Sequence, residues 1–229
     1  MMPAQPRKTL LCLLALLPAL LLSGCSQLLL RQTCVGLSHD IHYCLAPIEL
    51  QPPAPKRRQA PETEAAPGSG TEQQVSQLPL PFSATYKVAI GIEGASHELL
   101  SQIELDEARM TVVGLAPLGQ ALFTLEYDGT TLSSRQSLLL GEQFKAEYLL
   151  AMMQLIYWPE LSLAPRLEGG VLVAAPCGAD WCRDLYPGPL TAANATPVLS
   201  IRYDRRDPWL AQVQLQMPET GFSLNIKPL

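Results

Sequence analysis

Apolar and polar residues alternate along much of the chain from Phe82 onward, and this alternation constrains the fold more than any other feature. A period of two places every second side chain on one face of an extended strand, so an alternating run predicts a half-buried β-strand. The chain is therefore expected to be of the α+β class, mainly antiparallel β. The strand candidates are Tyr86–Ile92, Leu99–Leu105, Ala121–Tyr127, Val171–Ala175, Val198–Tyr203, Leu210–Met217 and Gly221–Lys227.

Two connections between these strands carry further information. Asp128-Gly129 predicts a two-residue hairpin turn, because Asp and Gly tolerate the positive φ that a type I′ turn requires. The connection Gly114–Gly119 follows the run Arg109–Val113 and contains two leucines, whereas most connections are polar. Leu115 and Leu118 therefore either reach out to an apolar surface or lie beneath the sheet.

The segment Lys145–Tyr157 predicts a long helix with an unusually wide apolar surface. Beyond its first residue only Glu147 and Gln154 are clearly polar, and they share one narrow stripe. A helix that rests on one sheet needs an apolar arc of only about 100°, and this helix has roughly twice that. It must therefore be covered on more than one side. Trp158-Pro159 is expected to end it, because proline disfavours the helical conformation of the residue before it.

Two interpretations of this helix remain open. It can be a packed helix held inside a curved sheet with a lid over it. Alternatively, part of its surface lines a cavity for an apolar ligand, where the flexible side chains of Met152 and Met153 would form an adaptable wall.

The N-terminal residues describe an export signal. Two basic residues precede the apolar run Leu10–Leu22. This run is too short to span a membrane, and small residues lie between it and Cys25. This pattern resembles a bacterial lipobox, with cleavage after residues 1–24 and acylation of Cys25. Ser26, in place of an aspartate, favours the periplasmic face of the outer membrane of a Gram-negative bacterium. The alternative is an ordinary secreted protein with a chance cysteine.

Four further cysteines follow the signal, and an even number in an oxidising compartment predicts two disulfides. Three pairings are possible, and the short spacings favour the two local ones, Cys34 with Cys44 and Cys177 with Cys182. The alternative is a zinc site, since two cysteines and two histidines crowd into residues 34–44. We expect disulfides and no metal.

Residues 51–79 are rich in Pro, Ala, Gln, Glu, Gly and Ser and contain few large apolar residues. Such a segment cannot bury enough surface to offset the entropy of ordering, so it predicts a disordered tether. The expected organisation is a signal over residues 1–24, a lipidated cysteine-bearing segment over residues 25–50, the tether over residues 51–79 and a globular domain over residues 80–229.

Several functional classes are disfavoured. The formal net charge is −5 and no cluster of Lys and Arg is evident in the globular part, so nucleic-acid binding is not expected. The chain carries no GxSxG elbow, HExxH helix or phosphate-binding glycine loop. We therefore expect neither an enzyme nor a cofactor, although spatially clustered acids, or a serine beside His97, would point to a lipid-acting enzyme.

Three motifs, in this order, resemble the LolB family of outer-membrane lipoproteins, and more closely the LolB-like lipoproteins encoded beside aryl polyene synthesis genes. They are Val112–Phe123, Tyr127–Gly129 and Glu147–Pro159. The resemblance implies an unclosed β-barrel of antiparallel strands with a helical lid over an apolar cavity. It also matches Leu118 to the leucine that serves membrane insertion in that family.

The function that the resemblance implies is binding of an acylated or polyene-type lipid cargo, received from a LolA-like periplasmic carrier and delivered to the outer membrane. Leu115 and Leu118 would touch the membrane. The alternative function is a non-catalytic scaffold lipoprotein that binds a protein partner in the cell envelope. The expected cavity wall comprises Tyr86, Val88, Phe123, Leu149, Met152, Met153, Ile156 and Trp158.

Overall fold

The computed structural model describes residues 34–48, 80–92, 94–140, 145–188 and 196–229, which belong to one compact unit, Cys34–Leu229. The predicted signal over residues 1–24, Cys25 and the predicted tether over residues 51–79 lie outside the described residues. No helix in the described ranges is long and apolar enough to cross a membrane.

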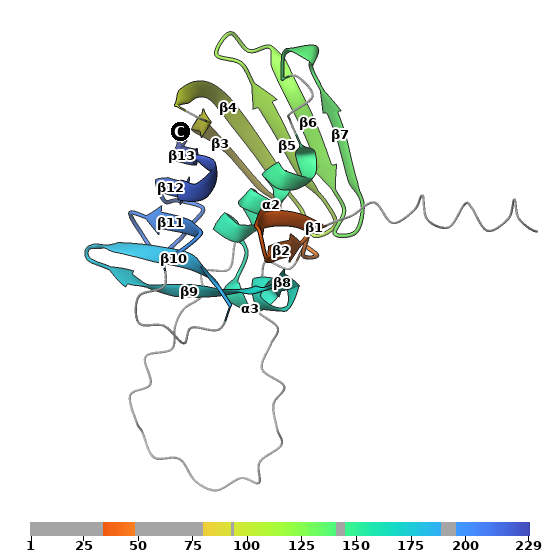
Figure 1. Cartoon of the computed structure of the whole chain (residues 1–229). Coiled ribbons are helices and arrows are strands. Elements are labelled where there is room, and N and C mark those ends of the chain that lie inside the picture. The colour runs from red at the N-terminus through yellow and green to blue at the C-terminus, as the bar shows by residue number, and fades with distance from the viewer. Residues whose placement is uncertain (1–33, 49–79, 93, 141–144, 189–195) are drawn as a thin grey trace, which may run out of the picture. The chain divides into compact units, whose positions relative to one another are not determined.

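Ten strands form one antiparallel sheet that curves around a helix (Figure 1). The sheet is not closed, since β7 and β9 are its two edges. The α+β fold class, mainly antiparallel β, is therefore confirmed. In spatial order the strands are β7 (Leu132–Gln136), β6 (Ala121–Tyr127), β5 (Met110–Leu115), β4 (Ala95–Leu105), β3 (Phe82–Ile92), β13 (Phe222–Pro228), β12 (Val213–Met217), β11 (Leu199–Tyr203), β10 (Asp180–Pro187) and β9 (Gly170–Cys177).

A second, three-stranded sheet consists of β1 (Cys34–Ser38), β2 (Ile41–Cys44) and β8 (Leu167–Glu168). Its inward side chains are fully buried in the hydrophobic core of the unit, among them Ile41 and Tyr43, which are 0% exposed. The sequence predicts that the cysteine-bearing segment lies apart from the globular domain. In the structure its residues 34–48 belong to the same compact unit, and the core includes Leu37, Ile41, Tyr43, Leu45 and Ala46.

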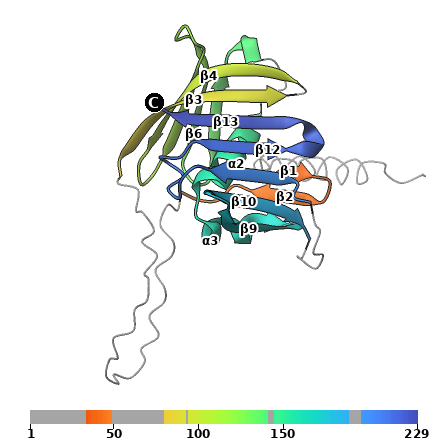
Figure 2. The ribbon, with the colours of Figure 1, turned by 90° about the vertical axis from the view of Figure 1, so that its left-hand side faces the viewer.

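Helix α2 (Ala146–Tyr157) lies between the two sheets (Figures 1 and 2). Nine of its twelve residues are buried, so the predicted coverage on more than one side is confirmed. The helix ends at Trp158, which is extended at φ −75° and ψ 150°, as the following proline predicts. The remaining helices of the described residues are short: α3 (Glu160–Leu163) and the 3₁₀ turns η1 (Leu138–Leu140), η2 (Ala164–Arg166) and η3 (Pro218–Thr220).

Strands β1, β2, β7, β8 and β10 were not predicted from the sequence. β7 is an edge strand with four exposed residues of five, and β10 has no regular alternation of buried and exposed residues, so neither shows the period of a half-buried strand.

The turn at Asp128-Gly129 has four residues rather than the predicted two, because Tyr127 pairs with Leu132. The Asp128 carboxylate accepts hydrogen bonds from the backbone N–H groups of Thr131 and Thr130 and from the Thr130 hydroxyl. These bonds hold the pKa of Asp128 below its ordinary value. Local bonding to the aspartate side chain therefore selects a longer turn.

Candidate functional site

One row of residues across the large sheet leaves a depression in the face that α2 covers. Tyr86 of β3 lies opposite Ser101 of β4. Ser101 lies opposite Gly114 of β5, and Gly114 lies opposite Phe123 of β6. Two small residues are thus side by side between two aromatic rings. A methyl group on Gly114 would overlap the Phe123 ring, so only glycine lets that ring lean over the strand.

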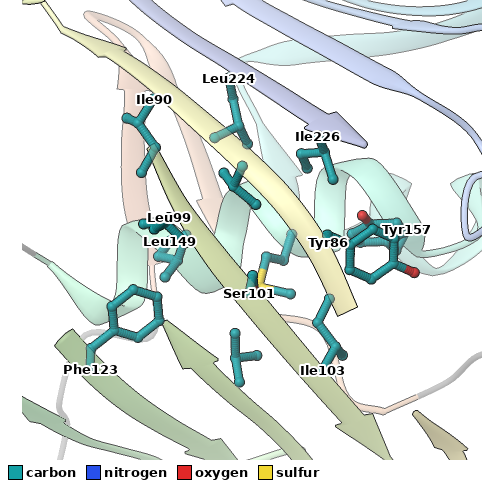
Figure 3. Close-up of a pocket in the computed structure, with 13 residues that line it drawn as sticks. Tyr86, Ile90, Leu99, Ser101, Ile103, Phe123, Leu149, Tyr157, Leu224 and Ile226 are labelled. Carbon is teal, nitrogen blue, oxygen red and sulfur yellow. The ribbon is translucent and has the colours of Figure 1, made fainter. Parts of the chain in front are cut away.

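Helix α2 forms the opposite wall of this depression. Leu149, Met153 and Tyr157 recur every four residues and therefore share one face of the helix. Together with Tyr86, Ser101 and Phe123 of the sheet they line a pocket of about 30 Å³, here called the inner pocket (Figure 3). This volume is about a tenth of the roughly 300 Å³ at the lower end of small-molecule sites. An acyl chain would therefore need the side chains around the inner pocket to move apart.

A second, larger pocket adjoins the first toward the N-terminal end of α2. This outer pocket has a volume of about 340 Å³, within the range of roughly 300–1,000 Å³ that small-molecule sites occupy. The two pockets share Ile90, Leu149 and Leu224. The other residues of the outer pocket are Ile92, Lys145, Tyr148, Met152 and Phe222. Apolar side chains thus line both pockets along α2, and this row of side chains, here called the apolar path, ends beside Lys145.

The inner pocket contains no charged side chain among the described residues, and its polar groups are hydroxyls. The Tyr86 hydroxyl donates a hydrogen bond to the carbonyl oxygen of Trp209 at 3.0 Å. The Tyr157 hydroxyl is buried and has no partner within the described residues. Burial raises the pKa of both tyrosines, so both are neutral at physiological pH. Ser101, also buried, is the third polar side chain.

An adjacent face of α2 is fixed to the N-terminal segment through Gln154. The Gln154 side-chain oxygen accepts hydrogen bonds from the Tyr43 hydroxyl and the Ala46 N–H, both at 2.8 Å. Its side-chain nitrogen donates to the Ala46 carbonyl at 2.8 Å. The predicted polar stripe of α2 is therefore in part a buried contact, and Gln154 is 0% exposed.

Arg183 of β10 holds the C-terminal end of α2. Its Nη1 atom donates to the carbonyl oxygens of Leu155, Ile156 and Trp158 at 3.0, 3.1 and 2.9 Å. The Tyr203 hydroxyl also donates to the Ile156 carbonyl, at 2.8 Å. These contacts fix the backbone around Tyr157. Sequence reasoning missed Arg183, and no local pattern marks it.

The structure distributes the predicted cavity residues over three places. The inner pocket is lined by five of them, Tyr86, Val88, Phe123, Leu149 and Met153, and the outer pocket by Met152 as well as Leu149. Ile156 and Trp158 line neither pocket. Both are 0% exposed, and the Trp158 indole N–H donates to the Pro47 carbonyl at 2.8 Å. Those two side chains belong to the packed core.

Leu118 lies at the tip of the turn between β5 and β6 and is 99% exposed. Hydrogen bonds from Ala116 N–H to Gln120 O and from Gly119 N–H to Ala116 O close this turn. Gly119 has a φ of +84°, which favours glycine. Leu115, by contrast, is half-buried at the end of β5.

A second fully exposed leucine lies at the same end of the sheet. Leu138 of η1 is 99% exposed, and its neighbour Ser137 donates a backbone hydrogen bond to Leu122, close to the start of β6. The turn after Ile92 also lies at this end, because Ile92 pairs with Ala95. Ile92 lines the outer pocket and is 46% exposed. The outer pocket and the exposed leucines therefore share one end of the sheet.

Both local disulfides, Cys34–Cys44 and Cys177–Cys182, are confirmed. Because Cys34 and Cys44 are bonded to each other, they cannot supply the thiolates of the alternative zinc site. In the described part of the chain no three His, Cys, Asp or Glu side chains are grouped so that they could hold a metal ion. His97 lies exposed on β4.

A family model described as "Protein of unknown function (DUF3261)" matches residues 83–229, more than half of the chain. The matched region contains every residue of both pockets, whereas strands β1 and β2 precede it. No curated protein matches the chain.

Proposed function

The chain belongs to the family DUF3261, which has no assigned function, and we propose that it is a LolB-like outer-membrane lipoprotein that binds an acylated or polyene-type lipid and helps deliver it to the outer membrane. In this proposal Cys25 carries the lipid anchor, the cargo comes from a LolA-like periplasmic carrier, and no bond is made or broken. The observation that carries the proposal is the apolar path between α2 and the sheet, which ends beside exposed leucines.

The path supports binding by the hydrophobic effect alone. At about 25 cal/mol per Å² of apolar surface, a largely buried acyl chain gains several kcal/mol. Release to the membrane requires that the bilayer bind the chain more tightly than the protein does. A pocket that must widen to take the whole chain meets this requirement, because the cost of widening lowers its net affinity.

The end of the sheet that holds the outer pocket is the proposed membrane contact. Leu118 and Leu138 are both 99% exposed there, and neither contributes to the protein's core. With both leucines in the bilayer surface, a chain in the outer pocket would leave past Ile92 and Lys145 toward the lipid. Leu115, which is half-buried, would support the turn rather than insert.

The second candidate function, a non-catalytic scaffold, is favoured by the small inner pocket of about 30 Å³. In that case α2 is a permanent part of the core, and the exposed leucines bind a protein partner.

Mass spectrometry of organic extracts tests the proposal. The full-length chain carrying Cys25→Ser is purified from the periplasm of its native host without detergent. A stoichiometric acylated or polyene molecule in the extract is the expected result and would name the cargo class. A clean extract, together with no uptake of a fluorescent fatty-acid probe, would exclude the lipid-binding function and favour the scaffold.

A substitution at Ser101 links any bound lipid to the inner pocket. Ser101→Val places two methyl groups in the depression between Tyr86 and Gly114 and should reduce probe uptake at least about tenfold, because the added volume occupies the site. Ser96→Val, on an exposed position of the same strand, is the matched control and should bind as the wild type does. Equal uptake by both variants would place the lipid elsewhere.

A further inference from the structure

The Tyr157 hydroxyl differs from those of the other fully buried tyrosines. Each of the other four donates a hydrogen bond within the protein: Tyr43 to Gln154, Tyr86 to Trp209, Tyr127 to Ala46 and Tyr203 to Ile156. Tyr157 is 3% exposed, and its hydroxyl has no partner among the described residues. A buried hydroxyl without a partner is rare in folded proteins and calls for an explanation.

Packing prevents Tyr157 from turning toward another partner. Its ring stacks on Trp209 with centroids 4.3 Å apart and an interplanar angle of 19°. On another side it contacts Tyr86, with centroids 6.1 Å apart. The backbone beside it is held by Arg183 and Tyr203, which both donate to the Ile156 carbonyl.

Tyr157, whose hydroxyl has no partner among the described residues, is one of the residues that line the inner pocket. Tyr157 and Tyr86 lie side by side at one end of the pocket, Phe123 lies at the other, and Ser101 lies between them (Figure 3). Ser101 interrupts an otherwise apolar inward stripe of β4, and it pairs directly with Tyr86. The polar groups of the pocket therefore gather near the C-terminal end of α2, away from the outer pocket.

We infer that the inner pocket binds an apolar chain whose inner end carries one uncharged oxygen, of a hydroxyl, carbonyl or ester group, which forms a hydrogen bond with the Tyr157 hydroxyl. This inference rests on the proposed lipid-binding function and specifies its ligand class. No charged side chain of the described residues lines the inner pocket, so a carboxylate there would be buried without a counter-ion. A charged end of the ligand would instead lie at the outer pocket, beside Lys145.

Competition with a fluorescent fatty-acid probe tests the inference on the full-length Cys25→Ser chain. The competitors are dodecane, dodecanol and dodecanoate, which share one chain length and differ in the group at one end. The wild type should prefer dodecanol to dodecane. Tyr157→Phe should weaken dodecanol binding by about three- to tenfold, which corresponds to one hydrogen bond, and leave dodecane binding unchanged.

Tyr127→Phe is the matched control, because the Tyr127 hydroxyl already donates to the Ala46 and Gly129 carbonyls and Tyr127 lines neither the inner nor the outer pocket. It should retain the preference for dodecanol. Equal affinity of the wild type for dodecane and dodecanol, or equal loss of the preference in both variants, would overturn the inference but leave the apolar pocket. If the wild type binds none of the three competitors and no probe, the proposed function itself fails.

Discussion

Single hydroxyl groups decide much of the energetics around the inner pocket. The Tyr86 and Tyr157 rings contact each other, yet only the Tyr86 hydroxyl has a partner within the described residues. The two side chains therefore offer the same chemical change in two different settings. Removing the Tyr86 hydroxyl breaks a hydrogen bond, whereas removing the Tyr157 hydroxyl eliminates a buried polar group that has no partner among the described residues.

Tyr86→Phe should lower the free energy of unfolding by about 1–2 kcal/mol, because it leaves the Trp209 carbonyl without its donor. Tyr157→Phe should leave that free energy unchanged or raise it by up to about 1 kcal/mol, since a buried unpaired hydroxyl is removed. Urea unfolding of the ligand-free chain measures both. A larger loss for Tyr157→Phe than for Tyr86→Phe would mean that its hydroxyl has a partner even without a ligand.

Two tyrosines should make the protein sensitive to alkali. Burial raises the pKa of Tyr203 and of Tyr127 to about 12 from the ordinary value of 10.0. Below pH 10 both tyrosines are protonated in the folded and unfolded states, and stability does not depend on them. Between about pH 10 and 12 the unfolded chain loses these protons first, so the folded state binds more protons and stability falls as the pH rises.

The expected slope is up to about 1.4 kcal/mol per pH unit for each tyrosine. When the unfolding free energy is measured across this pH range, its slope against pH should be smaller for Tyr203→Phe than for the wild type. This holds whether or not the variant is less stable at neutral pH. An unchanged slope in that variant would show that Tyr203 does not keep its proton in the folded state.

At the scale of elements, α2 is held by contacts from both sides rather than by its own ends. Its N-cap residue, Lys145, makes no side-chain capping bond, and no basic residue lies in its last turn. Arg183 supplies the positive charge and the donors at the C-terminal end from a distant strand. Gln154 joins the middle of the helix to the N-terminal segment.

Gln154→Ala should therefore lower the free energy of unfolding by about 2–4 kcal/mol, because the Ala46 N–H and the Tyr43 hydroxyl lose their common acceptor in a buried place. Glu147→Ala, on the same helix, is the control and should change it by less than about 0.5 kcal/mol. Chemical denaturation measures both effects. Hydrogen exchange should also become faster in residues 41–46 of the first variant, and unchanged exchange there would argue against this attachment.

At the scale of the whole molecule, Leu118 and Leu138 lie at one end of the sheet, and Leu161 of α3 lies beyond the other end of α2. A helix of twelve residues is about 18 Å long, which separates α3 from the outer pocket. Leu161 is 65% exposed and so provides a comparison for the proposed membrane contact.

Leu118→Glu and Leu138→Glu should each reduce binding of the full-length Cys25→Ser chain to phospholipid vesicles by about tenfold or more, because a carboxylate disfavours insertion at the bilayer surface. Both variants should stay within about 0.5 kcal/mol of the wild type in stability, since neither side chain is packed. Vesicle flotation measures the binding.

Leu161→Glu should bind vesicles as the wild type does. If it loses binding equally, the membrane contact is not confined to one end. If Leu118→Glu loses binding and Leu138→Glu does not, Leu138 has no part in the contact. Unfolding of Leu118→Glu would contradict the placement of that residue outside the core.

Local patterns in the sequence were sufficient to predict most strands, the single long helix, its end at Trp158 and both disulfides. Each of these features depends on residues close together in the chain, through a period, a proline or a short cysteine spacing. The edge strand β7 and the irregular strand β10 were not predicted, because the burial of their residues does not alternate with a period of two.

Only the tertiary structure decided which residues form the pocket. The register between β4 and β5 places Ser101 beside Gly114. The N-terminal segment covers Gln154, and Ile156 and Trp158 are buried in the packed core. A period in the sequence identifies the buried face of a strand or helix. It does not say which side chains from distant segments lie opposite one another on that face, because strand pairing and packing settle that jointly.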